Sequence, residues 1–556
     1  MTTTLVSGAD LFERHREMLD RARDAIRTRA YYSAFPESAR AYGETAMADG
    51  KQAFDARLHT TFALEQPSVG TASTERSPYA IDLGVQYPTA DVDALLAAAS
   101  HAGVAWAAAS IEARVGVALE ALARINARSF EMAHAVMHTS GQAYMMAFQA
   151  GGPHAQDRAL EAIAYAYEEM SRVPGRVLWE KPAKPEPLRI EKTFTIVPRG
   201  IDLTIGCSTF PTWNAYPGIF ASFVTGNAVI VKPHPLAILP LAITVEVLQQ
   251  TLREAGFDPA VVTLAVDPPG KPLAKELAQR PEIALIDYTG SSEFGTWLEK
   301  NTNALVYTEK AGVNSVVIDS TADMAGMVKN LAMSLTLYSG QMCTTPQNLF
   351  VPAGGITAGG EHVAFDAVVD ALVKAIDGFI AAPEKAVEVL GAIATDATAR
   401  RVDDENGKPG VVRKSVSLDH PKFPGARMRT PLIAVVDASE RERFSREAFG
   451  PIAFVVKTAN TDESLRLATE EAKSKGAITA IVHSTNPAVL EGAQRWARDA
   501  KVSIAVNLTG SLLVNQSAAF SDYHVSGGNP AGNAALTDAA FVANRFRIVE
   551  TRTPVS

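Results

Sequence analysis

The chain has 556 residues, of which 47% are hydrophobic and 20% charged, an ordinary composition for a globular protein with room for several domains. Lys and Arg number 52 against 61 Asp and Glu, a net charge of −9, so we expect no nucleic-acid partner. Two cysteines give no disulfide framework and favour a reducing compartment. We see no signal peptide and no apolar run of membrane-spanning length, so we expect a cytoplasmic enzyme without a membrane partner.

Helical spacing dominates the first third of the chain. Residues 9–29 place their apolar side chains on one stripe, which predicts a helix. Residues 31–88 are less regular and rich in Pro, Gly, Ser and Thr, and we expect them to wrap over a neighbouring surface. Helices are predicted again over 91–126, 129–139 and 156–170, the last one ended by a Pro-Gly pair.

Two histidines in the third predicted helix lie four residues apart and therefore on one face. His134 and His138 have the spacing of a metal pair, but no glutamate completes an HExxH pattern and no third ligand is evident. Packing histidines explain the pair better. We expect no metal site.

Segments 177–182 and 188–196 are separated by a Pro-rich turn, and the second alternates apolar and polar residues. They predict a hairpin that projects from the body. Residues 545–552 alternate in the same way and could pair with that hairpin across a subunit boundary. Because such edges are otherwise exposed, we expect a homodimer or homotetramer.

From residue 199 onward, apolar strands alternate with helices, which predicts an α/β protein with doubly wound parallel sheets. Strands of the first series are expected at 201–205, 227–231, 261–266, 283–288 and 304–308. A second series begins near residue 309, with a helix over 324–336 and strands that include 432–436, 452–457, 480–483 and 503–507.

Cys343 stands on a predicted turn between that helix and a short strand at 349–352. A cysteine on such a turn can point into a cleft, where backbone N–H groups stabilise its thiolate and an oxyanion formed on an attacked carbonyl. The alternative is a small buried hydrophobe, as most free cysteines are. We interpret the other cysteine, Cys207, as structural because it lies beside an apolar strand.

Six short motifs resemble those of the aldehyde dehydrogenase superfamily and occur in the same order. They are Thr212-Trp213-Asn214-Ala215-Tyr216-Pro217, Gly226-Asn227-Ala228-Val229-Ile230-Val231-Lys232-Pro233, Tyr288-Thr289-Gly290-Ser291-Ser292-Glu293-Phe294-Gly295, Thr308-Glu309-Lys310-Ala311-Gly312-Val313-Asn314, Gly340-Gln341-Met342-Cys343 and Glu447-Ala448-Phe449-Gly450-Pro451. The resemblance covers roughly residues 90 to 550. The extended N-terminus and the ending Ser526-Gly527-Gly528-Asn529-Pro530-Ala531-Gly532-Asn533 look like the PaaN type of phenylacetic acid degradation.

The resemblance implies roles for three residues. Cys343 would attack an aldehyde carbonyl as thiolate and form a thiohemiacetal. The side-chain amide of Asn214 and the backbone N–H of Cys343 would form the oxyanion hole. Glu309 would act as the general base that directs water onto the resulting thioester. The alternative, that Glu309 is a surface or helix-capping carboxylate, is less favoured because this residue ends a buried strand.

The resemblance also implies a nicotinamide cofactor. Gly290 and Ser291, with Gly295 in the same motif, would meet the pyrophosphate between strand and helix. Lys232 resembles the lysine that contacts the adenosine ribose. Glu447, with Phe449 beside it, resembles the carboxylate that binds the nicotinamide ribose.

Pro235 stands where the family pattern has a glutamate that accepts hydrogen bonds from the adenosine ribose. Without that glutamate the site lacks a carboxylate that would repel a 2′-phosphate, so the sequence favours NADP over NAD. Two other departures concern local geometry. Asn214 is followed by two residues before Pro217 instead of one, and the stretch from Glu309 to Asn314 lacks the usual Gly-Gly-Lys.

The resemblance divides the chain into four parts: an N-terminal extension (1–88), a cofactor-binding domain (89–175 and 199–308), a catalytic domain (309–510) and an oligomerisation element (176–198 and 511–556). The implied substrate is an aldehyde, in the PaaN case the CoA-linked semialdehyde from ring opening. A CoA-acylating enzyme and a non-catalytic binding protein remain alternatives; Glu309 disfavours the first, and Cys343, Asn214 and Glu309 together disfavour the second. A thiol hydrolase is disfavoured because no histidine is expected near Cys343.

Overall fold

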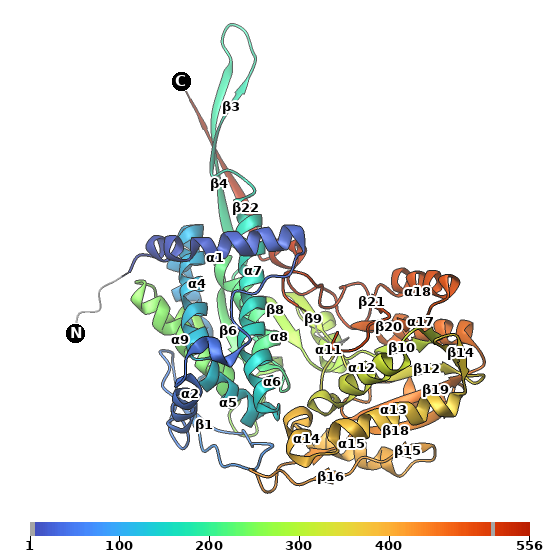
Figure 1. Ribbon diagram of the computed structural model, residues 1–556. Helices are drawn as coiled ribbons and strands as arrows, with labels where there is room; N and C mark the ends of the chain where they lie inside the picture. The colour runs from blue at the N-terminus through green and yellow to red at the C-terminus, as the bar shows by residue number, and fades with distance from the viewer. Residues whose placement is uncertain (1–5, 513–517, 556) are drawn as a thin grey trace.

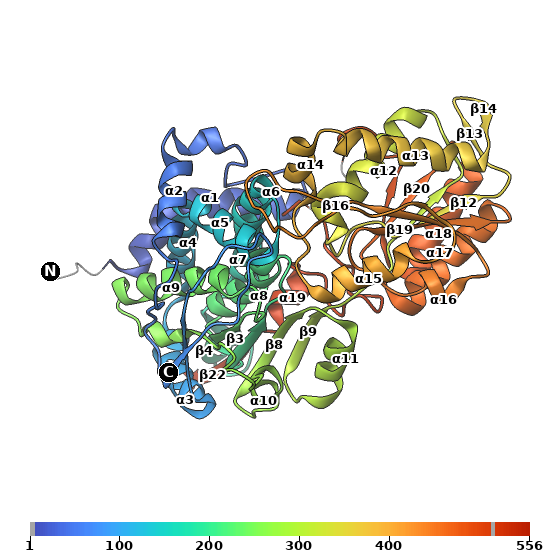
Figure 2. The ribbon, with the colours of Figure 1, turned by 90° about the horizontal axis from the view of Figure 1, so that it is seen from below.

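The computed structural model describes residues 6–512 and 518–555. Two α/β units lie side by side, and a narrow three-stranded sheet projects from the first (Figures 1 and 2). The predicted fold class, an aldehyde dehydrogenase-like α/β architecture, is confirmed.

The first unit contains a parallel sheet of five strands in the order β7-β6-β5-β8-β9. The strands are β5 (Ile201–Ile205), β6 (Ala228–Lys232), β7 (Val262–Leu264), β8 (Ile283–Thr289) and β9 (Leu305–Glu309), and the intervening helices are α8 (Pro211–Val224), α9 (Leu239–Glu254), α10 (Ala274–Ala278) and α11 (Ser292–Asn301). Every residue of β5 and β6 is buried, as expected for strands covered on both faces. Since the strand order reverses at β5, a ligand cleft is expected at the carboxyl ends of these strands.

The second unit contains seven strands in the order β15-β18-β19-β12-β10-β20-β21, all parallel except β15. They are β10 (Ser315–Ile318), β12 (Asn348–Pro352), β15 (Val411–Arg413), β18 (Leu432–Asp437), β19 (Ile452–Thr458), β20 (Thr479–His483) and β21 (Ser503–Val506). Alternate residues of β10 enter two separate cores. Val317 packs toward α17 (Thr461–Lys475) and α18 (Pro487–Ala500), and Val316 toward α12 (Met324–Thr336) and α13 (Phe365–Ile380).

The N-terminal extension packs against the first unit. The predicted first helix is present as α1 (Gly8–Thr28) and buries Leu11, Phe12 and Leu19. The stretch predicted to be irregular contains a further helix, α2 (Ala46–Asp55), with Phe54 as its buried residue. Gly50 weakens the helical pattern of this segment in the sequence. The structure shows why the residue is a glycine, because a Cβ there would lie 2.3 Å from Cβ of Phe130.

Helical residues 91–127 divide into α3 (Val92–Ala108) and α4 (Ile111–Ala127), because Ser110 caps α4 by accepting a hydrogen bond from the Ala113 N–H. Among the described residues, no single helix is long and apolar enough to cross a membrane; α3 and α4 meet that test only as a pair bent by 118°.

The paired histidines lie in α5 (Ser129–Ser140) and stack on the ring of Phe54. Burial lowers the pKa of His134 to about 4 and that of His138 to about 3. His138 Nδ1 lies 3.3 Å from Ser77 Oγ. Both rings are therefore neutral packing groups at physiological pH.

The projecting sheet consists of β3 (Arg176–Lys181), β4 (Leu188–Pro198) and β22 (Phe546–Pro554), in the order β22-β4-β3 (Figure 1). The sequence favoured pairing of the C-terminal strand across a subunit boundary, and this prediction is wrong: β22 pairs with β4 of the same chain, Phe546 opposite Pro198. Arg545 fixes the start of β22, since its buried guanidinium donates to both carboxylate oxygens of Asp287 at 2.6 and 2.7 Å.

The rest of the C-terminal segment does not project. Phe520 is fully buried, and the Lys310 N–H donates to the Ala531 carbonyl at 2.6 Å, so this segment returns across the body beside β9. Only β22 of the described residues after 511 joins the projecting sheet. Residues 513–517 of the predicted oligomerisation element lie outside the described residues.

Candidate active site

Two cavities meet at Cys343. The first has a volume of about 560 Å³ and lies at the carboxyl ends of the parallel strands of the first unit, where Ile205, Lys232 and Glu309 line it. The second, of about 410 Å³, lies on the other side of the cysteine. Asn214 and Cys343 line both. The cysteine therefore stands where two ligands could approach each other.

The turn that carries Cys343 has a strained backbone. After α12, Tyr338 and Ser339 both adopt φ of +51°, unusual for residues with side chains. Ser339 Oγ donates to the Leu390 carbonyl at 2.9 Å, which helps to fix this conformation. Gly340, with φ of +64°, leaves no room for a Cβ, which would lie 2.5 Å from the Gly450 carbonyl oxygen.

Cys343 itself is held by its backbone, and its side chain is only partly buried. Its carbonyl accepts a hydrogen bond of 2.7 Å from the Asn314 amide. Burial from water, and then the carboxylate of Glu309, raise the pKa of the thiol well above its ordinary value. The thiol is therefore protonated at neutral pH and must lose its proton before it can act as a nucleophile.

Glu309 ends β9 and its side chain is only 1% exposed. One carboxylate oxygen accepts from Nδ2 of Asn214 at 2.9 Å, and the other lies 3.1 Å from Nε2 of His524. Burial alone raises the Glu309 pKa, but the imidazole and the hydrogen bonds outweigh burial and leave the pKa below its ordinary value. The group is a buried carboxylate that stays ionised, as a general base requires.

Asn214 lies in the first turns of α8. Pro211 occupies the first position of this helix, where a missing N–H costs nothing. Pro217 then falls inside the helix. Asn214 is thereby directed at Glu309 and Cys343, so the structure brings together the three residues predicted to be catalytic. The oxyanion role of Asn214 remains a prediction.

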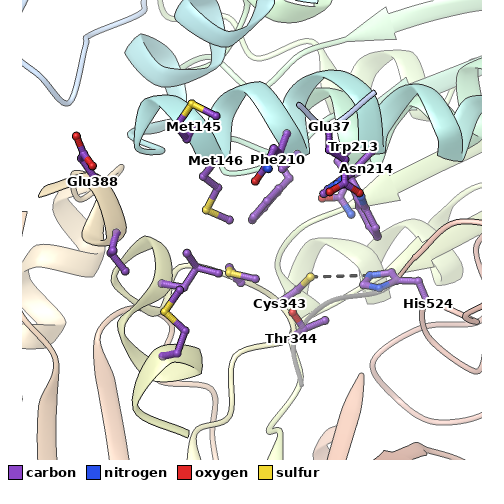
Figure 3. Close-up of a pocket in the computed structure, with 17 residues that line it drawn as sticks. Glu37, Met145, Met146, Phe210, Trp213, Asn214, Cys343, Thr344, Glu388 and His524 are labelled. Atoms are coloured by element: carbon purple, nitrogen blue, oxygen red, sulfur yellow. Dashed lines mark hydrogen bonds and ion pairs between the residues drawn. The ribbon is translucent and has the colours of Figure 1, made fainter. Parts of the chain in front are cut away.

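His524 is the site residue that the sequence reasoning missed. Its Nε2 lies 3.9 Å from Cys343 Sγ (Figure 3), so the expectation of no histidine near the cysteine is wrong. It reaches the site from the C-terminal segment, 181 residues away in sequence. No local pattern marks it; the one available hint was its position just before the segment Ser526 to Asn533, which carries the finer resemblance.

The predicted cofactor residues mostly line the larger cavity. Lys232, Pro235, Gly290, Ser291, Glu447 and Phe449 are among its lining residues. Gly295 is not among the described lining residues; it lies inside α11, where a Cβ would meet Lys310 Cγ at 2.7 Å, so it serves close packing. Ser291 caps α11 by accepting from the Phe294 N–H.

These groups fit a nicotinamide dinucleotide. The N-terminus of α11 presents N–H groups suited to a pyrophosphate. Burial raises the pKa of Glu447 to about 7, in spite of Arg401 nearby, and hydroxyl donors from a ribose would stabilise its ionised form. Glu447 is thus a half-buried carboxyl in the lining of this cavity, and it suits the hydroxyl groups of a sugar ligand.

Asp267 is a second residue that sequence reasoning missed. It follows β7 at the edge of the cavity, and its carboxylate lies 2.8 Å from Nζ of Lys232. Its other oxygen accepts from the Leu273 N–H at 2.9 Å. An Asp just beyond a parallel strand, at the edge where α/β sheets bind ligands, was the signal that could have found it.

The smaller cavity is predominantly apolar. Its lining includes Met145, Met146, Phe210, Trp213, Met333, Leu337, Met342 and Val389. The acidic residues Glu37 and Glu388 also line it, and Figure 3 shows Glu388 at the end opposite His524. Glu37 lies 3.0 Å from His154, so the N-terminal extension contributes to this wall. No lysine or arginine is among the described lining residues.

Ligand atoms of Glu309, Cys343 and His524 lie within 4.8 Å of one another, a spacing that a divalent ion would tolerate. Glu309 already accepts hydrogen bonds on both oxygens, so the cluster is explained by its own contacts and we assign no metal to it. The expectation of no metal stays a prediction.

Comparison with known proteins identifies the class. The model of the aldehyde dehydrogenase family matches residues 83–536. The chain belongs to this family and is an oxidoreductase that acts on the aldehyde group.

Particular relatives narrow the comparison. A crystal structure described as an NAD-dependent aldehyde dehydrogenase from Burkholderia multivorans is 54% identical, with a TM-score of 0.97 over 98% of this chain and 99% of that one. An N-succinylglutamate 5-semialdehyde dehydrogenase from Burkholderia multivorans is 27% identical over 412 residues, 72% of this chain and 80% of that relative. A 1-pyrroline-5-carboxylate dehydrogenase variant from Thermus thermophilus is 20% identical, with a TM-score of 0.74 over 95% and 99% of the two chains, and shares the fold.

Proposed function

We propose that this protein oxidises an aldehyde whose chain next to the carbonyl is uncharged and apolar to the carboxylic acid, with NAD as the cofactor. The observation that carries the proposal is the placement of Cys343, Glu309 and Asn214 where an apolar cavity meets a dinucleotide-sized one. The first cavity would hold the aldehyde and the second the cofactor.

In the first half-reaction, Sγ of Cys343 releases its proton to solvent water and bonds to the carbonyl carbon. Negative charge then develops on the carbonyl oxygen, where the Asn214 amide and the Cys343 N–H would donate to it. For this, Nδ2 of Asn214 must turn from Glu309, which it contacts in the unliganded protein. The nicotinamide supplies a hydride acceptor when bound, and the loss of hydride restores the C=O bond as a thioester of Cys343.

In the second half-reaction, a water oxygen bonds to the acyl carbon while Glu309 takes the water proton. The C–S bond breaks, the electron pair returns to sulfur and the carboxylic acid leaves. An ionised, buried Glu309 supports this hydrolytic ending over transfer of the acyl group to coenzyme A.

The cofactor proposal replaces the preference for NADP that Pro235 indicated. That preference treated Lys232 as a free cation for a 2′-phosphate. Asp267 instead lies 2.8 Å from the lysine ammonium and would face that phosphate with a like charge. Its carboxylate can accept from ribose hydroxyls, as the missing glutamate would. These contacts support NAD.

For the substrate we propose the CoA-linked semialdehyde from ring opening in phenylacetate catabolism, as the PaaN resemblance implies. Its chain near the aldehyde carries no charge, because the far carboxyl is a thioester, and the apolar lining suits such a chain. Succinylglutamate semialdehyde, named for the relatives, is less suited, since it carries carboxylates and the described lining offers Glu37 and Glu388 but no lysine or arginine.

A kinetic screen tests the function, the cofactor and the substrate together. We expect kcat/KM with NAD to exceed that with NADP by about tenfold or more, a difference of about 1.4 kcal/mol. We expect the CoA-linked semialdehyde and neutral aliphatic aldehydes to exceed free semialdehyde acids of equal length by a similar factor. No aldehyde-dependent NADH formation would contradict the function. Faster turnover of succinylglutamate semialdehyde would contradict only the substrate assignment.

We also propose that the projecting sheet binds a second copy of this chain. Leu178, Leu188 and Val549 are 52 to 55% exposed on it, and its outer strands β3 and β22 have unpaired edges. We expect Leu178→Glu to lower the oligomeric mass measured by light scattering. Val69→Glu, an equal change at a 74% exposed site in the N-terminal extension, is the control. An unchanged mass for the Leu178 variant would contradict this assembly.

A further inference from the structure

We propose that His524 is a positioning residue for this reaction: its Nε2–H holds the Glu309 carboxylate beside Cys343 and separates the two negative groups that catalysis requires. The inference rests on the proposed function, because it assigns a role within the same site. Nothing in the family motifs marks this histidine.

The geometry is that of one donor shared by two acceptors. His524 Nε2 lies 3.1 Å from Glu309 Oε1 and 3.9 Å from Cys343 Sγ (Figure 3). An ionised carboxylate can only accept, so Nε2 carries the hydrogen in the first contact. The same hydrogen faces a thiolate when Cys343 loses its proton.

The imidazole is held in place from several sides. The ring of Trp213 meets it edge-on, with centroids 4.6 Å apart, and Arg158 stacks on Trp213 at 5.1 Å. The His524 carbonyl accepts from the Leu536 N–H at 3.2 Å. The next residue, Val525, is fully buried and adopts φ of +61°, a strained conformation for a β-branched residue. Such strain persists only where the surroundings fix the backbone.

The position of Nε2 reduces the electrostatic repulsion between Glu309 and Cys343. Catalysis needs an ionised Glu309 and, in the same cavity, a Cys343 thiolate. Two anions at this distance with little water between them repel strongly, and one proton would be shared between them. A donor between the two groups stabilises both charges at once.

Other charged groups nearby act elsewhere. Arg158 forms an ion pair of 2.8 Å with Glu161, and His154 pairs with Glu37 in the lining of the smaller cavity. Glu447 and Cys207 face the cofactor cavity, and each would add negative charge if ionised. Among the described residues, His524 is the ionisable side chain that contacts both Glu309 and Cys343.

Two substitutions distinguish the loss of the hydrogen-bond donor from a change in the shape of the side chain. His524→Phe keeps a ring beside Trp213 but removes the donor, whereas His524→Gln places an amide N–H near the position of Nε2. In rapid-mixing experiments with NAD and aldehyde, we expect His524→Phe to lower the steady-state rate about tenfold more than the initial burst of NADH. His524→Gln should recover most of that difference. His101→Gln, an exposed histidine on α3, is the control.

A second measurement does not depend on turnover. The rate of Cys343 alkylation by iodoacetamide, followed by mass spectrometry in the presence of EDTA, reports the thiolate fraction as a function of pH. We expect His524→Phe to shift this profile to higher pH by about one unit, which makes alkylation about tenfold slower at a fixed neutral pH. A merely structural histidine would leave the profile in place.

Two results would contradict the positioning role of His524. An unchanged ratio of burst to steady-state rate together with an unchanged alkylation profile in His524→Phe would overturn the proposal. So would equal defects in the Gln and Phe variants, because rescue by a donor is its central requirement. If the wild-type protein oxidises no aldehyde, the proposed function fails, but the alkylation profile still tests whether His524 stabilises the thiolate.

Discussion

Replacement of Cys343 by alanine is expected to abolish aldehyde-dependent NADH formation, with a loss of at least about 10⁴-fold in kcat/KM. In the proposed function the thiol is the nucleophile that forms the covalent intermediate, and removal of a nucleophile leaves only the contribution of binding and oxyanion stabilisation. The side chain is only partly buried, so the fold should remain. The measurement is NADH absorbance, with NAD binding followed by cofactor fluorescence.

Cys207→Ala is the matched control for this experiment. Cys207 lines the cofactor cavity but is not among the described residues that line the smaller, apolar cavity, so it is not placed to attack an aldehyde held there. Its Sγ donates weakly to Asn214 Oδ1 at 3.5 Å. We expect this variant to stay within about tenfold of the wild type. Substantial turnover in a well-folded Cys343→Ala protein, or a comparable loss at Cys207, would remove Cys343 from the nucleophile's role.

The alternation of apolar strands and helices predicted most of the fold, because buried parallel strands are continuous apolar runs such as 228–231. The local sequence pattern failed to predict helices in places where tertiary contacts determine the structure. Helix α2 buries a single residue, so its periodicity is weak. Pro217 lies inside α8, although a proline disfavours a helix interior, so the local sequence alone argues against a continuous helix there.

The same distinction applies to the site. Cys343, Glu309 and Asn214 lie in motifs of the family, so resemblance found them, and the fold brings them together from α8, β9 and the turn after α12. His524 and Asp267 act through residues distant in sequence: one through Glu309, the other through Lys232. Pairing of that kind is set by how strand ends and loops converge, which a single sequence does not encode locally.

Glu309→Gln is expected to uncouple the two half-reactions. The amide keeps the shape of the carboxylate but cannot take a proton from water, so acylation proceeds and hydrolysis stops. We expect a burst of about one equivalent of NADH per site and then a steady-state rate about 10²- to 10⁴-fold below that of the wild type. Mass spectrometry of acid-quenched protein should show the acyl group on Cys343.

The pH dependence sharpens this prediction. Since the Glu309 pKa lies below its ordinary value, hydrolysis in the wild type should keep its base down to mildly acidic pH. The Cys343 pKa lies well above its ordinary value, so the burst rate should rise with pH through the neutral range. In Glu309→Gln the rise of the burst rate should begin at a lower pH than in the wild type, because the neighbouring anion that opposes formation of the thiolate is gone. If burst and steady-state rates instead fell by the same factor, with no acyl group on Cys343, Glu309 would act before the thioester forms, and the hydrolytic assignment would be wrong.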